Sequence, residues 1–351
     1  MAPFGKRLAG FWPLSFPLAL AFLLAWAGCA SRGSPQIIPV PMLASSELQE
    51  KIRRVVSSVV GVAAVFDYRI EFFNHELVNG EFVADPASPT GYRLVKDESA
   101  ITVSPKVQKV NGGGVMIYRD DKRALILTSQ HILMLPDTLL TFQRDAAGNN
   151  TDVLFSRAIK KRTTYHVLDQ FNQFEPAEVL YTDVRSDLGL LTTTPLSSIG
   201  TPFPYTVAYK TEVKWGDLAY AFGYPREIKQ LTLGVISPAP YPGSFALNVV
   251  GRFGFSGGPV FLIQPDGELA FVGIIRGVPV NKLQYIAPPS KLLTGEHLVP
   301  EDITRLRVEE VEMIEYGIVY AIGAERIGRF LKDSLPLLER KGIFLSKHWL
   351  P

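Results

Sequence analysis

The sequence predicts an all-β protein, either a sandwich or a barrel, with a short helix before the strands and another after them. Short apolar runs recur from residue 107 to residue 322, and turn residues separate them. Few amphipathic helical patterns lie between these runs, which argues against parallel βαβ units. With 351 residues, of which 47% are hydrophobic and 20% charged, the chain can bury a sizeable core.

The first folded element should be a helix that begins near Ser46. Ser46 and Gln49 have the spacing of a capping box, and apolar residues share one face of the helix. A strand should cover residues 59–66 and extend toward residue 72. Turn residues between positions 79 and 89 indicate that residues 74–104 form an insertion with a hairpin in it.

The remaining elements follow from the apolar runs and the turns between them. The basic run 160–162 is interpreted as a solvated loop, and residues 324–331, extending toward residue 340, as a C-terminal helix. Strands are expected at residues 113–118, 124–128, 139–143, 177–181, 188–193, 218–222, 230–236, 245–249, 260–263, 269–275 and 316–322.

Charge and composition argue against several classes of function. A net charge of +2 leaves no electrostatic footprint for nucleic acid. The single Cys29 allows no internal disulfide and no cysteine-based metal site. The five histidines are scattered without metal-ligand spacing. We therefore expect no metal, no cofactor and no nucleic-acid partner.

The N-terminus has the layout of a secretory signal. Lys6 and Arg7 precede an uncharged apolar stretch at residues 8–30, and prolines within it disfavour a continuous membrane-spanning helix. The run Ala27-Gly28-Cys29 resembles the lipobox of bacterial lipoproteins, in which the cysteine becomes the lipidated N-terminus after cleavage. Ala25 and Ala27 also fit an ordinary A-x-A cleavage site.

The lipobox resemblance implies a membrane anchor on Cys29. Because Ala30 and Ser31 are not the aspartate associated with inner-membrane retention, the expected place is the outer membrane, facing the periplasm. The ordinary cleavage site implies a soluble periplasmic or secreted protein instead.

One serine stands among glycines in the run Gly251–Val260. Ser256 is surrounded by Gly251, Gly254, Gly257 and Gly258, and Pro259 and an apolar run follow. Glycines allow positive φ and close approach to the main chain, so such a serine can sit on a tight turn beside exposed backbone N–H groups. A nucleophile for acyl transfer needs this arrangement. A glycine-rich turn between two strands is the alternative.

A histidine and an aspartate occur at matching places earlier in the chain. His131 follows the strand expected at residues 124–128, and Asp187 opens the apolar run 188–191. Asp183, four residues earlier, is an alternative candidate for this aspartate. The order His131, Asp187, Ser256 resembles the motif regions of trypsin-like serine proteases, most closely the bacterial Deg-type (high-temperature-requirement) branch. Residues 113–115, 219–225, 234–237 and 316–322 extend the resemblance over roughly residues 48–331.

The resemblance implies a fold and a set of roles. The fold is two packed antiparallel β-barrels of the chymotrypsin type, and the substrates are polypeptides. His131 is the general base, Asp187 orients its imidazole, and Ser256 is the nucleophile. The backbone N–H groups of Gly254 and Ser256 form the oxyanion hole. Val250, six residues before the nucleophile, lines the specificity pocket and favours small or medium apolar side chains at the P1 position.

The sequence departs from the family at several points. Phe255 replaces the aspartate of digestive enzymes and the asparagine common in the Deg branch, so zymogen activation by a salt bridge to a new N-terminus is not expected. No PDZ domain is expected after the protease. Residues 277–310 are longer than the family needs and are a candidate substrate-side loop.

The expected domain organisation has five parts. They are a signal peptide at 1–28, a lipidated cysteine and tether at 29–45, a helix and first barrel at 46–200, a second barrel and helix at 201–340, and a tail at 341–351.

Two alternatives to a protease remain open. One is a catalytically inactive protease-fold lipoprotein that binds envelope proteins. The other is an α/β-hydrolase esterase, in which Gly254-x-Ser256-x-Gly258 is the nucleophile elbow, and Asp302 or Asp333 acts with His348.

Overall fold

The computed structural model describes residue 45 onward, except residues 146–149, 170, 172, 195–199, 210, 211, 240, 266 and 288–306. The predicted signal peptide, Cys29 and nearly all of the predicted tether therefore lie outside the described residues. Residues 44–351 form one compact unit. Among the described helices, none is both long enough and apolar enough to cross a membrane.

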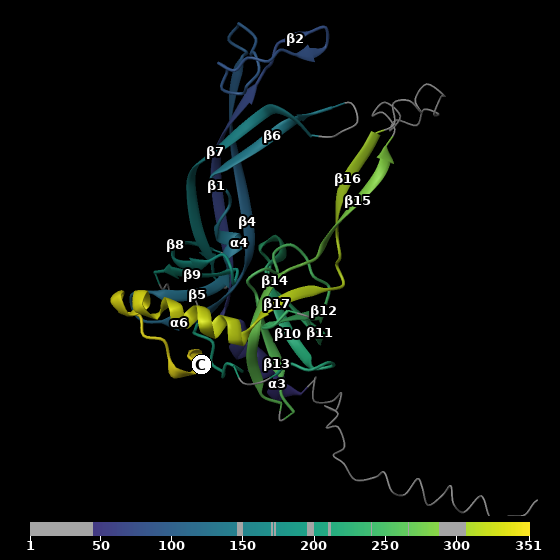
Figure 1. Ribbon diagram of the computed structural model, residues 1–351. Coiled ribbons are helices and arrows are strands. Elements are labelled where there is room, and N and C mark those ends of the chain that lie inside the picture. Colours follow the sequence, from purple (N-terminus) through teal and green to yellow (C-terminus); the bar gives the residue numbers. More distant parts are fainter. Residues whose placement is uncertain are drawn as a thin grey trace, which may run out of the picture. The chain divides into compact units, whose positions relative to one another are not determined.

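The predicted N-terminal helix is present as α3 (Ser46–Val56). Its cap differs from the expectation, because the hydroxyl of Ser45, not Ser46, accepts a hydrogen bond from the Leu48 N–H at 3.1 Å. Leu48 and Val55 are buried on one face of the helix. The chain then enters β1 (Val59–Phe73) almost directly (Figure 1).

The first barrel contains six antiparallel strands, and β1 closes it by pairing with β7. The order is β1-β4-β5-β9-β8-β7, and β6 extends the sheet beyond β7. The hairpin expected in the 74–104 insertion is formed by two short strands. The bounds are β2 (Leu77–Val78), β3 (Glu81–Phe82), β4 (Ile101–Arg119), β5 (Ala124–Ser129), β6 (Thr138–Arg144), β7 (Asn150–Leu168), β8 (Phe174–Asp183) and β9 (Leu188–Thr193).

The second barrel is closed by six antiparallel strands in the order β10-β11-β12-β17-β14-β13. Its interior is an apolar cluster that includes Phe245, Phe255 and Ile275. Two antiparallel barrels confirm the predicted fold class. The bounds are β10 (Leu218–Gly223), η1 (Pro225–Glu227), β11 (Gln230–Pro238), β12 (Ser244–Asn248), β13 (Pro259–Ile263), β14 (Leu269–Gly277) and β17 (Val319–Gly323).

The interpretation of residues 160–162 as a loop is wrong, because they lie inside the long strand β7. Lys160 donates to the Leu135 carbonyl at 2.7 Å, and Arg162 donates to Asp67 at 2.8 Å. Its longest apolar run is only the three residues 153–155, so its sequence carries no strong local signal. Its pairing with β1 holds it in place, and that contact is distant in sequence.

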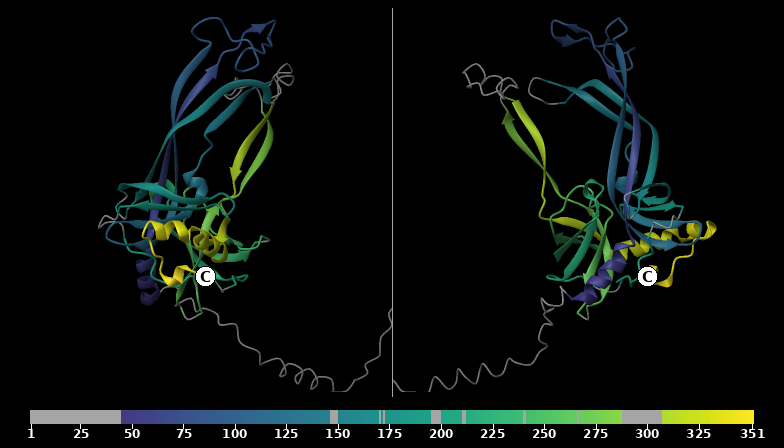
Figure 2. Two further views of the ribbon diagram at one scale, coloured as in Figure 1. Left: turned by 60° about the vertical axis from the view of Figure 1, so that its left-hand side comes forward. Right: turned by 180° about the vertical axis from the view of Figure 1, so that it is seen from behind.

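The long segment after β14 is also more regular than expected. Its two ends form an antiparallel hairpin, β15 (Val280–Ala287) with β16 (Arg307–Ile314), which projects from the second barrel (Figure 2). Residues 280–287 and 307–310 of the candidate substrate-side loop 277–310 therefore belong to a hairpin, and its place on the substrate side stays a prediction. Its middle, residues 288–306, lies outside the described residues.

The C-terminal helix is present as α6 (Ala324–Arg340), and it extends to residue 340, the farther of the two predicted ends. Most of the eleven residues expected as a tail are exposed, but Ile343 and Trp349 among them are buried. Trp349 is fully buried, with its ring centroid 5.2 Å from that of Phe271 and 5.9 Å from that of Phe203. The apolar surface of this indole explains why the end of the chain folds back.

Lys229, just before β11, holds an amine in a largely buried position beneath α3. Its Nζ donates to the Val56 carbonyl, the last of α3, at 2.8 Å. Burial lowers the pKa of Lys229 to about 8, although the carboxylate of Asp169 opposes the shift. The unfolded chain therefore binds more protons than the folded chain between pH 8 and the ordinary lysine pKa near 10.5.

We expect the free energy of unfolding to rise by about 2 kcal/mol between pH about 8 and about 10. Above pH about 8 the Lys229 amine is neutral in the folded chain, and the cost of removing its proton on folding falls as the pH rises. Lys229→Met should remove this rise, and Lys214→Met, at an exposed lysine, should keep it. Urea unfolding across the range measures the slope. Equal slopes in Lys229→Met and the wild type would contradict the prediction.

Candidate active site

His131 is delivered by the end of β5. The register of β5 with β9 pairs Ser129 with Leu188, so the residues just beyond this pair, His131 and Asp187, emerge side by side. His131 lies in the one-turn helix α4 (Gln130–Leu133), which buried Ile132 and Leu133 anchor to the first barrel.

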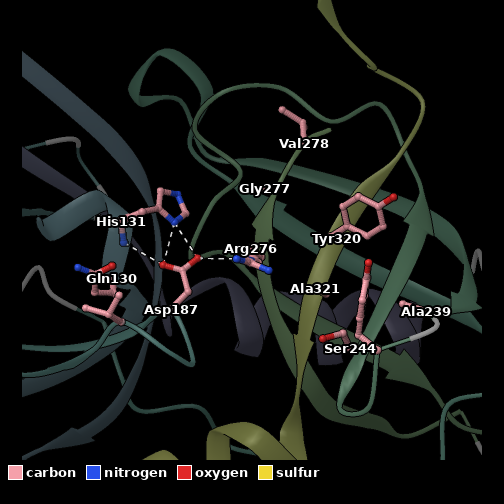
Figure 3. Close-up of a pocket in the computed structure, with 12 residues that line it drawn as sticks. Gln130, His131, Asp187, Ala239, Ser244, Arg276, Gly277, Val278, Tyr320 and Ala321 are labelled. Carbon is pink, nitrogen blue, oxygen red and sulfur yellow. Dashed lines mark hydrogen bonds and ion pairs between the residues drawn. The ribbon is translucent and has the colours of Figure 1, made fainter. Parts of the chain in front are cut away.

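Asp187 contacts His131 through both the ring and the backbone (Figure 3). The His131 Nδ1 lies 2.9 Å from Oδ2 and 3.1 Å from Oδ1, and the His131 backbone N–H donates to Oδ1 at 3.0 Å. The Asp187 carbonyl accepts from the Gln130 N–H at 3.0 Å. Asp187 has a φ of 57°, a left-handed conformation that aspartate tolerates better than most residues. Hydrogen bonds therefore hold both the carboxylate and the backbone of Asp187 in place.

The rival aspartate, Asp183, performs a different task. Its carboxylate accepts from the backbone N–H groups of Arg185 and Ser186 at 3.1 Å each and from the Ser186 hydroxyl at 2.6 Å. The hydrogen bond from the Ser186 hydroxyl lowers the pKa of Asp183. Asp183 thus closes the turn between β8 and β9, and Asp187 is the carboxylate that contacts the imidazole.

Ser256 lies on the turn before β13, where the two barrels meet. Its carbonyl accepts from the Gly113 N–H of β4 at 2.7 Å. A Cβ on Gly113 would stand 2.8 Å from the Cα of Gly258, and one on Gly258 would stand 1.8 Å from the Phe222 carbonyl oxygen. The glycines of this motif therefore allow main chains to approach where no side chain fits.

His131 and Ser256 line the same open cavity of about 910 Å³. No hydrogen bond joins them among the described residues, and the Nε2 of His131 is unpartnered there. The backbone N–H groups of Gly254 and Ser256 likewise donate to no acceptor in the described part of the chain. Gly254 has a φ of 102°, which favours glycine. The turn thus leaves two N–H donors uncommitted beside the serine.

Phe255 takes over the anchoring of this turn. Its ring is buried in the core of the second barrel, where a Cβ on Gly223 would stand 2.5 Å from it. Its N–H donates to the Arg252 carbonyl at 3.1 Å, and its carbonyl accepts from the Gly258 N–H at 3.0 Å. Apolar packing therefore anchors this turn. The family pattern of digestive enzymes has an aspartate at the position of Phe255.

Arg276 is a residue of the site that the motif analysis missed. It lies at the end of β14, and its Nε is 3.5 Å from Oδ2 of Asp187 (Figure 3). It also borders both cavities that touch His131. The only sequence signal was a cation that directly follows the apolar run 269–275.

Val250 stands apart from the other predicted site residues. Its side chain is 59% exposed, and it lines neither of the two cavities that border His131. Its part in specificity stays a prediction.

The described structure contradicts the α/β-hydrolase alternative. The sheets around Ser256 form closed antiparallel barrels, whereas that fold needs a parallel sheet. His348 lies in the short η3 (Lys347–Trp349), where its ring contacts the Ser346 hydroxyl at 2.9 Å. Asp302 lies outside the described residues.

Two antiparallel barrels, with a histidine–aspartate pair whose histidine lines one cavity together with a glycine-framed serine, are the arrangement of the chymotrypsin fold. Residues 112–274, just under half of the chain, match the family of the trypsin-like peptidase domain.

The chain is also similar to a solved structure, the HtrA-type protease AlgW with a decapeptide. The match has 14% identity and a TM-score of 0.43, and it covers 84% of this chain and 67% of that one. A comparison with curated proteins found no match.

Proposed function

We propose that the protein is a serine endopeptidase that cleaves polypeptides of the bacterial cell envelope through His131, Asp187 and Ser256. The observation that supports this most is that Asp187 contacts both the ring nitrogen and the backbone N–H of His131. His131 and Ser256 line the same cavity. The signal-like segment 1–28 and Cys29 support the location, with an outer-membrane lipid anchor as the preferred arrangement.

The chemistry follows from the geometry of these groups. Ser256 is a weak nucleophile until His131 accepts its proton at Nε2 during attack on the peptide carbonyl. Asp187 accepts a hydrogen bond from Nδ1–H, which keeps Nε2 free as a base and then stabilises the imidazolium. His131 passes the proton to the leaving amine, an acyl-enzyme forms on Ser256, and water completes hydrolysis by the reverse sequence.

The oxyanion in this proposal is stabilised by the N–H groups of Gly254 and Ser256, which have no other acceptor among the described residues. Because Phe255 anchors the turn through apolar packing, no ion pair with a new N-terminus is needed to shape it. We therefore propose that activity does not depend on zymogen cleavage.

A fluorophosphonate probe separates this proposal from an inactive binding protein. The wild type should be labelled at Ser256, Ser256→Ala should not be labelled, and His131→Ala should react at least about a thousand-fold more slowly. His348→Ala should be labelled like the wild type. An unlabelled wild type that is otherwise folded would leave the inactive protease-fold scaffold as the function.

A further inference from the structure

The active-site cavity on the Ser256 side carries an excess of positive charge. Besides His131, its charged lining side chains are Lys109, Arg226, Arg252 and Arg276, and no carboxylate lines it among the described residues. Positive charge next to a nucleophile affects which substrates can bind.

Two of the four cations already have partners. Lys109 forms an ion pair with Glu227, and Arg276 lies 3.5 Å from Asp187. In the described part of the chain, Arg226 and Arg252 have neither a carboxylate nor a hydrogen-bond acceptor for their guanidinium groups. Both residues are exposed. The uncompensated charge of the cavity is therefore concentrated on these two arginines.

Both arginines are attached to the turn that carries the nucleophile. The Arg252 carbonyl accepts a hydrogen bond from the Phe255 N–H at 3.1 Å. Arg226 follows Pro225, whose Cα would lie 2.7 Å from a Cβ on Gly254. Arg226 and Glu227 have φ values of 53° and 63°, so this loop keeps two consecutive non-glycine residues in a left-handed conformation. The backbone of both arginines is thus linked to the turn that carries Ser256, and both residues line the cavity that Ser256 borders.

The cavity on the other side of His131 has a different character. It measures about 630 Å³, and its charged lining residues apart from His131 are Asp187 and Arg276, which contact each other. Apolar and aromatic side chains, including Val184 and Tyr320, make up much of the rest. His131, Arg276, Gly277 and Val278 border both cavities, so an extended peptide at Ser256 would cross from a neutral half into a cationic half.

From this asymmetry we infer that the enzyme selects polypeptides with acidic side chains on one side only of the scissile bond. Arg226 and Arg252 bind these carboxylates, since a guanidinium matches a carboxylate with two parallel hydrogen bonds. The inference rests on the proposed protease function and adds its substrate class. The same charges disfavour basic residues at those positions.

The test compares matched peptides that carry Asp, Asn or Lys at each position from four residues before to four after one cleavable bond. The wild type should cleave the Asp peptides about ten-fold faster in kcat/KM than the Asn peptides, at positions on one side only. Raising salt from about 50 mM to about 500 mM should shrink this preference.

The variants assign the preference to the two arginines. Arg226→Gln with Arg252→Gln should abolish it, and each single change should weaken it. Lys332→Gln removes one exposed positive charge on α6 and should leave the preference intact. A wild type that cleaves Asp and Asn peptides equally, or that prefers Asp on both sides, overturns the inference and leaves the protease function standing.

A binding measurement separates substrate preference from catalysis. Fluorescence anisotropy with the Ser256→Ala protein should show tighter binding of the Asp peptides, and this advantage should be lost when both arginines are replaced. That result supports the inference even if no peptide is cleaved, in which case only the proposed catalysis fails. Equal binding of Asp and Asn peptides overturns it.

Discussion

Asp187→Asn should lower kcat by about 10⁴-fold while the protein stays folded. The His131 backbone N–H donates to Oδ1, so an asparagine will keep its carbonyl oxygen there. The amide nitrogen then occupies the place of Oδ2, 2.9 Å from the ring Nδ1, and donates to it. This fixes the ring proton on Nε2. A protonated Nε2 cannot accept the proton of Ser256.

Steady-state cleavage of a peptide substrate measures this loss, and thermal unfolding checks the fold. Asp183→Asn is the matched control, since the same chemical change falls four residues away on a carboxylate that only closes a turn. It should cost some stability and keep kcat within about three-fold, because the lost contacts are hydrogen bonds of about 1 kcal/mol distant from the reacting atoms. The assignment is wrong if Asp183→Asn is the variant that loses activity.

Phe255→Ala should destabilise the protein by about 3–5 kcal/mol, the usual cost of removing a buried aromatic ring. The ring is 2% exposed in the core of the second barrel, and Gly223 leaves space for it. A cavity at this place also releases the turn that presents Ser256 and the Gly254 N–H. We therefore expect kcat to fall even at temperatures where the variant remains folded.

Phe253→Ala provides the comparison for stability. It removes the same side chain two residues earlier, where the ring is 68% exposed, so its free energy of unfolding should change by less than about 0.5 kcal/mol. Phe255→Leu, which keeps apolar volume, should recover much of the lost stability and turnover. Equal losses in the two alanine variants, measured by urea unfolding, would show that the turn does not depend on the buried ring.

The accuracy of the sequence prediction depended on how local the signal was. The runs 188–191 and 218–222 are apolar and lie next to turn residues, and the structure has strands there. Strand β7 has no such run, because long-range pairing with β1 holds it rather than its own apolar pattern. The burial of Trp349 was equally invisible, since its partners Phe203 and Phe271 are distant in sequence.

The sequence by itself determined the all-β class, because apolar periodicity and turn residues are local properties of the chain. Its resemblance to the motifs of trypsin-like serine proteases singled out a histidine, an aspartate and a glycine-framed serine. The tertiary structure puts Asp187, which the sequence already favoured over Asp183, against His131, through the register that pairs Ser129 with Leu188. It alone also placed Arg276 against Asp187 and brought Arg226 into the cavity that Arg252 and Ser256 line. Distances between side chains far apart in sequence depend on strand pairing and barrel closure, and no local pattern encodes them.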